Sequence, residues 1–121
     1  MIGIGIDAVD VERFRRSLDR TPGMRARLFT AAELAYLAER VDPVPGLAAR
    51  FAAREAAMKA LEQGLGAWGF HDVSVGREGL GPPKLLVVGR AAEVASGLGV
   101  VGWRLSLTHT ATVALAVVAA L

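Results

Sequence analysis

The sequence contains no cysteine, and this absence excludes several kinds of chemistry. Disulfides, thiolate nucleophiles, zinc–thiolate sites and iron–sulfur clusters all require that residue. Aromatic residues make up only 6% of the chain, and the net charge is +2 because 14 basic residues are nearly balanced by 12 acidic ones. Single-stranded nucleic acid is usually bound by a basic groove interleaved with aromatic side chains. We therefore expect no nucleic-acid partner.

Long hydrophobic runs are also missing. A secretory signal needs a positive start and an apolar run of about 7–15 residues, whereas Asp7 introduces a charge early in this chain. The segment from Leu105 to Leu121 carries no formal charge, but its 17 residues include several polar ones, and a bilayer span needs roughly 20 apolar residues. We therefore expect a cytoplasmic protein that does not enter membranes.

The remaining composition is typical of one folded domain over residues 1–121, since 53% of the residues are apolar and no linker divides the chain. The periodicity of apolar residues predicts an α+β fold, in which a small antiparallel sheet packs on a long central helix beside shorter helices. In chain order we expect a strand at 1–6, helices at 8–20, 31–40 and 47–63, strands at 70–75 and 84–88, a helix at 90–98, and buried strands at 103–107 and 113–118.

The first strand alternates isoleucine with glycine. Gly3 and Gly5 share the face opposite the isoleucines, which indicates that another backbone or a ligand approaches there. Asp7 stands where this strand is expected to end. Further along, Thr30 and Glu33 have the spacing of a capping box, which predicts the start of a helix.

The expected helix at 47–63 carries the strongest chemical signal. Seven alanines cover most of the side opposite its large apolar residues, so both sides should be buried. Charged groups on such a helix need partners because isolated buried charges are costly. Glu55 and Lys59, four residues apart, either form an ordinary surface pair or join Asp7 in a site that binds Mg²⁺ and phosphate.

Two further features allow both an ordinary and a functional interpretation. The glycines from Gly64 to Gly69 have dinucleotide-binding spacing, but they follow a helix and precede a strand, the reverse of the required order. They form either a helix cap and turn or a backbone loop that lets a phosphate approach. His109, between two apolar strands, is either a core residue or a switchable donor to an anion.

Three strings together resemble holo-[acyl-carrier-protein] synthase, the small single-domain class of 4′-phosphopantetheinyl transferases. They are Gly-Ile-Gly-Ile-Asp at 3–7, Arg-Phe-Ala-Ala-Arg-Glu-Ala-Ala-Met-Lys-Ala at 50–60 and Ser-Leu-Thr-His-Thr at 106–110. The resemblance covers nearly the whole chain in order. It implies Mg²⁺-dependent transfer of 4′-phosphopantetheine from coenzyme A to a serine hydroxyl of an acyl carrier protein, with release of adenosine 3′,5′-bisphosphate.

The resemblance also implies roles for particular residues. Asp7 and Glu55 would hold Mg²⁺ on the diphosphate of coenzyme A. Lys59 would contact the phosphate and protonate the leaving group. His109 and Thr110 would contact the nucleotide from the neighbouring subunit of a homotrimer. Glu55, Lys59 and His109 are therefore the candidate catalytic residues.

Binding roles extend to further positions. Arg50 and Arg54 would contact phosphate, and Gly64 and Gly66 are candidates for a backbone contact to the cofactor. On the first helix, Arg13 and Arg16 either meet the acidic surface of a carrier protein or are simply solvated.

Two positions depart from the family pattern. Arg54 stands where the family usually has lysine, and Pro82 stands where it usually has a basic residue. A guanidinium keeps the ability to bind phosphate but not to transfer a proton. Two alternatives to an enzyme are a non-catalytic trimeric module that binds nucleotide or RNA, and a purely structural trimerising domain.

Overall fold

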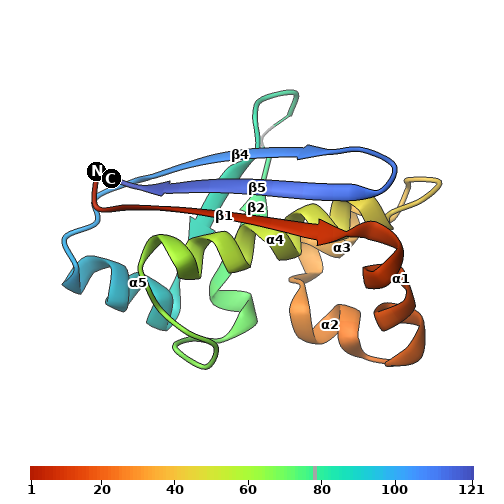
Figure 1. Cartoon of the computed structure of the whole chain (residues 1–121), viewed down its shortest axis with the longest axis horizontal. Coiled ribbons are helices and arrows are strands. Elements are labelled where there is room, and N and C mark those ends of the chain that lie inside the picture. The colour runs from red at the N-terminus through yellow and green to blue at the C-terminus, as the bar shows by residue number, and fades with distance from the viewer. Residues whose placement is uncertain (78) are drawn as a thin grey trace.

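The computed structural model describes residues 1–77 and 79–121, and it confirms the α+β fold (Figure 1). The strands are β1 (Gly3–Asp10), β2 (Val73–Gly76), β3 (Lys84–Val87), β4 (Trp103–His109) and β5 (Val113–Ala120). The helices are α1 (Val11–Arg20), α2 (Met24–Leu28), α3 (Ala31–Leu37), α4 (Val44–Ala60) and α5 (Gly89–Gly97), with a 3₁₀ turn η1 (Phe70–Asp72).

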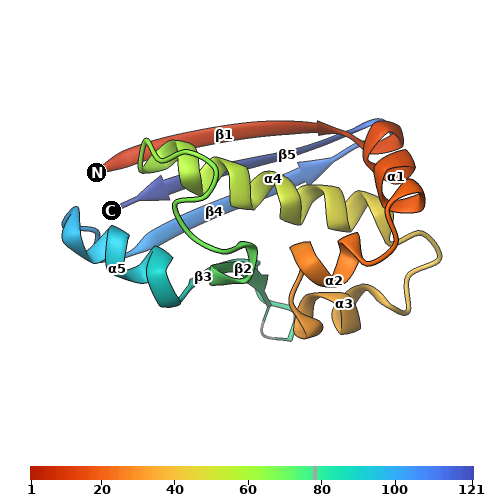
Figure 2. The same ribbon diagram turned by 90° about the horizontal axis from the view of Figure 1, so that it is seen from below.

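A three-stranded antiparallel sheet of order β1-β5-β4 forms one layer, and α4 runs along its underside (Figure 2). The pairing runs from Gly3 opposite Ala120 to Asp10 opposite Val113. Strands β2 and β3 form a separate antiparallel pair. As predicted, both sides of α4 are buried, and all seven of its alanines are at most 4% exposed. The core therefore lies between α4 and the sheet, and between α4 and the other helices.

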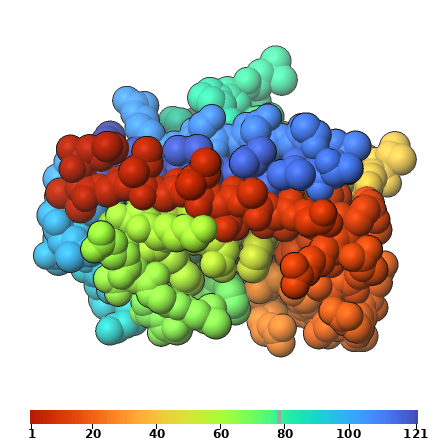
Figure 3. Space-filling view, in the orientation of Figure 1, coloured from red at the N-terminus to blue at the C-terminus, as the bar shows by residue number. Residues whose placement is uncertain are grey.

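The glycines of β1 allow α4 to lie directly against the strand. A Cβ atom at Gly3 would overlap the carbonyl oxygen of Ala60, and one at Gly5 would overlap the carbonyl oxygen of Ala56. The close approach predicted from the sequence is therefore that of another backbone, the α4 helix. In the space-filling view β1 forms a continuous band below the atoms of β4 and β5 (Figure 3).

The prediction that the first strand ends near Asp7 is wrong. The strand continues to Asp10 because residues 8–10 keep the ladder with β5. The Asp10 carboxylate then accepts a hydrogen bond of 2.8 Å from the backbone N–H of Arg13 and caps α1. Asp7 consequently lies in mid-strand, on the side that faces α4, and not in a connecting loop.

Other boundaries differ for local reasons. Helix α4 starts at Val44, earlier than expected, because a proline such as Pro45 is tolerated in the first turn, where its missing N–H has no helical partner. The helix ends at Ala60, and two residues later Glu62 adopts a φ of 55°. The capping box of Thr30 and Glu33 is confirmed. Helix α2 was not expected, since five residues are too few for a periodic signal. In the described part of the chain, no helix has both the length and the apolar character that a membrane crossing requires.

The C-terminal strands are buried on one face only. On β5, Ala114, Ala116, Val118 and Ala120 are 0% exposed, whereas the residues between them are partly exposed. Strand β4, predicted to be buried, has no fully buried residue because it lies at the edge of the sheet. Helix α4 covers only one side of the sheet. The opposite side, here called the open sheet face, presents the apolar side chains of Ile4, Ile6, Leu115 and Val117.

Replacing Gly5 by alanine should destabilise the fold, because the new methyl group meets the α4 backbone, which cannot move aside alone. We expect a loss of about 1–3 kcal/mol or more in the free energy of unfolding, measured by urea denaturation. Gly97→Ala is the matched control, since a Cβ there meets nothing within 4 Å. Equal stability of the two variants would contradict the proposed contact.

Candidate active site

Three charged side chains meet where β1 crosses α4. The Nζ atom of Lys59 lies 3.1 Å from Oδ1 of Asp7 and donates a hydrogen bond of 3.0 Å to the carbonyl oxygen of Ile6. Glu55 lies one helical turn before Lys59 and is half-buried. The grouping of these three residues, which the sequence alone left open, is therefore present.

The electrostatics of this group favour a cation. Burial raises the pKa of Glu55, the charge of Asp7 raises it further, and Lys59 only partly opposes both effects. Two carboxylates that repel each other in a half-buried position are stabilised by a shared positive charge. Mg²⁺ suits such a pair because it takes one or two protein carboxylates and fills its other positions with water and phosphate oxygens. The described residues hold no cluster of three or more metal-ligating side chains.

A cleft of about 560 Å³ opens beside these carboxylates. We call it the acidic cleft, and its lining residues are Asp7, Ala8, Val9, Asp10, Arg13, Phe14, Ser17, Met24, Phe51 and Glu55. Arg13 from α1 lies at its edge and is exposed, whereas Arg16 is exposed but does not line it. The acidic cleft is thus bordered by α1, whose arginines were expected either to meet a carrier protein or to be solvated.

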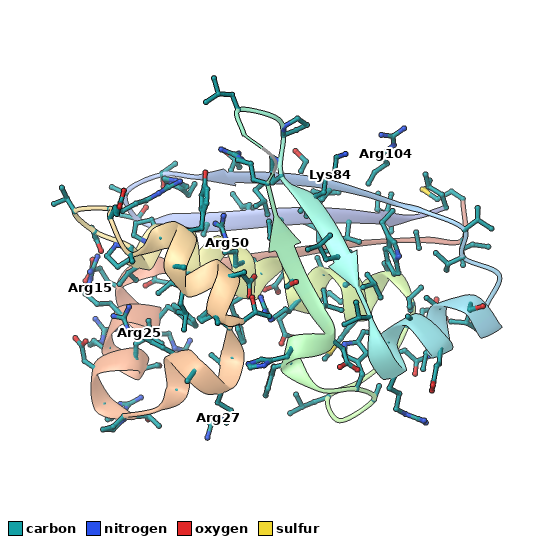
Figure 4. The ribbon with its side chains drawn as sticks, turned by 180° about the vertical axis from the view of Figure 1, so that it is seen from behind. Arg15, Arg25, Arg27, Arg50, Lys84 and Arg104 are labelled. Carbon is teal, nitrogen blue, oxygen red and sulfur yellow. The ribbon has the colours of Figure 1, made fainter. Side chains whose placement is uncertain are left out.

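A second cavity, of about 510 Å³, lies at the opposite edge of the sheet, beside β4. We call it the basic pocket, and its lining residues are Arg40, Gly46, Ala49, Arg50, Arg77, Pro82, Pro83, Leu105, Ser106, Leu107, Thr108 and His109. His109 is exposed at the end of β4, so it is not a core residue. Arg50, seen from behind in Figure 4, lies beneath the sheet near α3.

The predicted residues therefore fall into two groups and not one. Asp7, Glu55 and Lys59 belong to the β1 edge, while Arg50 and His109 belong to the β4 edge, with β5 between them. Within one chain these groups do not meet.

Thr110, Gly64 and Gly66, the other candidates for cofactor contacts, lie in connecting segments. The Oγ1 atom of Thr110 accepts hydrogen bonds from the backbone N–H groups of Thr112 and Val113, at 3.2 and 3.1 Å, and so shapes the β4–β5 turn. Gly64 and Gly66 lie in the connection that follows α4, and a Cβ at either would meet nothing within 4 Å. The cofactor contacts assigned to these residues stay predictions.

The prediction that Arg54 contacts phosphate is incompatible with the structure. Its side chain is 1% exposed, and its two Nη atoms donate to both carboxylate oxygens of Glu33, at 2.9 and 2.5 Å. Its Nε donates to the carbonyl oxygen of Phe70 at 2.9 Å. Because all three groups are engaged and buried, no phosphate reaches them. Glu33 also accepts from the backbone N–H of Val75 at 3.0 Å, so the pair connects α3, α4, η1 and β2.

Sequence reasoning missed several residues around the basic pocket. Tyr36 and Arg40 are four residues apart at the end of α3 and just beyond it, whereas Arg77 follows β2, and no spacing in the chain connects it to them. Pro82, the second departure from the family pattern, also lines this pocket.

Comparison with known proteins supports one family throughout. A family model described as the 4′-phosphopantetheinyl transferase superfamily matches residues 3–118. The chain therefore belongs to this superfamily.

Within it, the similar proteins share one name. The holo-[acyl-carrier-protein] synthase of Moorella thermoacetica is 44% identical over 97% of this chain and 91% of its own. That of Streptomyces avermitilis is 47% identical over 99% and 97%. A crystal structure of the Neisseria meningitidis holo-[acyl-carrier-protein] synthase superposes with a TM-score of 0.88 at 32% identity, covering 99% of this chain and 98% of that one. The Helicobacter pylori synthase, in complex with coenzyme A, matches with a TM-score of 0.80 at 25% identity, over 97% and 98%. The resemblance predicted from the three strings is confirmed.

Arg54→Met should strongly destabilise the protein, because it leaves the Glu33 carboxylate buried without its partner. We expect a loss of about 3–5 kcal/mol in the free energy of unfolding, measured by urea denaturation. The control is the double variant Glu33→Leu with Arg54→Met, which removes both charges and should be more stable than the single variant.

The pH dependence of that stability should also reverse. In the parent chain burial alone would raise the pKa of Glu33, but hydrogen bonds from Arg54, Thr30 and Val75 outweigh it, so the pKa is lowered. This contribution is complete above the unfolded-state pKa and is lost as the pH falls through the folded-state value. In Arg54→Met burial prevails and raises the pKa, so mild acid should reduce the penalty. Parallel pH profiles for the two proteins would contradict this account.

Proposed function

We propose that this chain is an enzyme that transfers 4′-phosphopantetheine from coenzyme A to a serine hydroxyl of an acyl carrier protein in the cytoplasm. The observation that carries the proposal is the pairing of Asp7 and Glu55 at the acidic cleft, with Lys59 hydrogen-bonded to Asp7, in a chain of this family. The similar proteins carry the name of this activity, and one of them is described in complex with coenzyme A.

The groups at the acidic cleft act by stabilising the negative charge of the phosphate groups of coenzyme A. Asp7 and Glu55 would hold Mg²⁺, which when bound would neutralise charge on the diphosphate of coenzyme A. The Lys59 ammonium, 3.1 Å from Asp7 and largely exposed, contacts a phosphate oxygen and supplies a proton to the departing adenosine 3′,5′-bisphosphate. Phosphoryl transfer depends mainly on such positioning and charge stabilisation.

The nucleotide end of coenzyme A occupies the basic pocket of a second chain. Arg50, His109 and Thr110 supply contacts there, in line with the family resemblance. Because the acidic cleft and the basic pocket lie at opposite edges of one sheet, a single ligand can use both only where two copies meet. Head-to-tail contacts of this kind form a ring when the rotation between neighbouring chains closes. The proposed ring is a homotrimer. Each site lies in the cleft between two neighbouring chains, and the open sheet faces are covered in the assembly.

The carrier protein approaches along α1. Arg13 and Arg16 are exposed, and Arg13 lines the acidic cleft, so an acidic partner bound there brings its serine next to the reacting phosphate. Opposite charges on the two surfaces speed association, and salt weakens the attraction.

Glu55→Gln should abolish most of the transfer, because the amide cannot neutralise a bound cation. A metal contributes several kcal/mol to such a reaction, so we expect a loss of about a thousandfold in kcat. The measurement is the mass gained by an apo carrier protein incubated with coenzyme A and Mg²⁺. Glu93→Gln, at an exposed glutamate on α5, is the control and should keep full activity. Coenzyme A binding without any transfer by the parent chain would favour the non-catalytic module instead.

Ile6→Lys should disrupt the trimer, because it introduces a charge into the open sheet face. Ile6 is 57% exposed in one chain, so the folded monomer should tolerate the change. Sedimentation should give three times the 12.7 kDa chain mass for the parent and the single mass for the variant. Val88→Lys is the matched control, since Val88 is 56% exposed at the start of α5. A parent protein that sediments as a monomer at working concentrations would refute the assembly.

A further inference from the structure

Arg15 of α1 is held by acidic residues on two sides. Its Nη1 and Nη2 atoms donate to Oδ1 and Oδ2 of Asp42, at 2.9 and 2.7 Å. Its Nε atom donates to the two carboxylate oxygens of Glu12, at 3.3 Å each. Two parallel hydrogen bonds between a guanidinium and a carboxylate fix the relative orientation of the two groups, which a single contact between exposed charges does not.

Asp42 is itself fixed at the start of α4. It lies in the connection 38–43 between α3 and α4, beside Arg15 (Figure 4), and its Oδ1 accepts a hydrogen bond of 3.1 Å from the backbone N–H of Val44, the first residue of α4. The Arg15 guanidinium, and to a smaller extent this N–H group, lower the pKa of Asp42 to about 2, so the pair stays ionised at neutral pH. A directional contact therefore joins α1 to the start of α4.

This contact lies away from the arginines that are free for a partner. At 100° per residue, Arg13, Arg16 and Arg20 lie together on one side of α1, and Arg15 lies on another. The first three are exposed, whereas Arg15 is only partly exposed. The side of α1 that carries Arg15 thus faces the protein's own chain, and the side that carries the other arginines faces solvent.

The remaining contact between α1 and α4 is apolar. Phe14 is buried under α1, and its ring centre lies 5.3 Å from that of Phe51 on α4. Both residues line the acidic cleft. Apolar packing holds the helix in place but is non-directional. The fork between Arg15 and Asp42 is therefore the contact that determines how α1 is turned beside the cleft.

We propose that the Arg15–Asp42 pair is a positioning contact, which fixes the orientation of α1 and with it the arginines that receive the carrier protein. This inference rests on the proposed function, in which an acidic carrier approaches along α1. A helix that is already oriented loses less conformational freedom when the partner docks. Asp42 and Glu12 also neutralise Arg15, so the carrier is attracted to the opposite side of the helix.

Two single variants test the pair because they change the charge in opposite directions. Arg15→Gln removes a positive charge, and Asp42→Asn removes a negative one while keeping an oxygen for the N–H of Val44. Each should raise the KM for apo carrier protein about fivefold, with kcat and the KM for coenzyme A at their parent values. The double variant should be no worse than either single one, because the contact is lost only once. Glu39→Gln, at an exposed glutamate in the same connection, is the matched control for Asp42→Asn and should keep the parent KM.

Direct binding of the carrier by Arg15 predicts a different pattern. Asp42→Asn would then release Arg15 to the carrier and lower the KM for it, while only Arg15→Gln would raise that KM. Such opposite changes, or a carrier KM that neither variant alters, would overturn the inference and leave the transferase assignment intact.

Amide hydrogen exchange tests the pair without turnover. Exchange of the residues of α1 should be faster in Arg15→Gln and in Asp42→Asn than in the parent chain, whereas the alanine-rich middle of α4 should keep its protection. Unchanged exchange in α1 would overturn the inference. A parent chain that transfers nothing to any carrier would overturn the proposed function, and the exchange measurement would still decide whether the pair fixes α1.

Discussion

The contact between β1 and α4 is the constraint on which the rest of the structure depends. With only hydrogen atoms at Gly3 and Gly5, the strand lies directly against the carbonyl groups of Ala56 and Ala60. Because side chains alternate along a strand, Asp7 faces the helix just as the two glycines do. The same close approach that builds the core therefore brings Asp7 to Lys59 and near Glu55. The close approach of β1 to α4 therefore explains both the packing of the core and the position of Asp7.

The chain places its charges in two regions with opposite requirements. At the acidic cleft, two carboxylates are stabilised by a cation, whereas at the basic pocket three guanidiniums are stabilised by an anion. The central strand β5 keeps them apart within one molecule. A ligand such as coenzyme A, which carries a diphosphate and a separate phosphate on its ribose, would join these regions only between molecules, which connects the proposed assembly to the proposed chemistry.

The Arg54–Glu33 pair shows how position in the fold decides what a charged residue does. Arg54 and Glu55 are neighbours in sequence, yet the helix turns them to different sides. Arg54 points into the protein and joins four elements through Glu33 and Phe70, while Glu55 points toward the cleft. A guanidinium suits the internal position because its planar fork matches the two oxygens of a carboxylate. The replacement of the family's lysine at this position therefore concerns stability and not the transfer chemistry.

Much of this protein follows from its sequence alone. The alternation of isoleucine and glycine, the capping box at Thr30 and the alanine-rich helix are local patterns, and each led to the element that is observed. The family also followed from the three strings, since they occur in order along nearly the whole chain.

Tertiary structure decided the rest, because contacts between distant segments leave no local pattern. The extension of β1 past Asp7 depends on its ladder with β5, and the burial of Arg54 depends on Glu33 from another helix. The arginines gathered around Tyr36 come from separate segments and meet only in the folded chain. The sequence thus determined which elements and chemical groups are present, and only the packing of those elements determined which groups face one another.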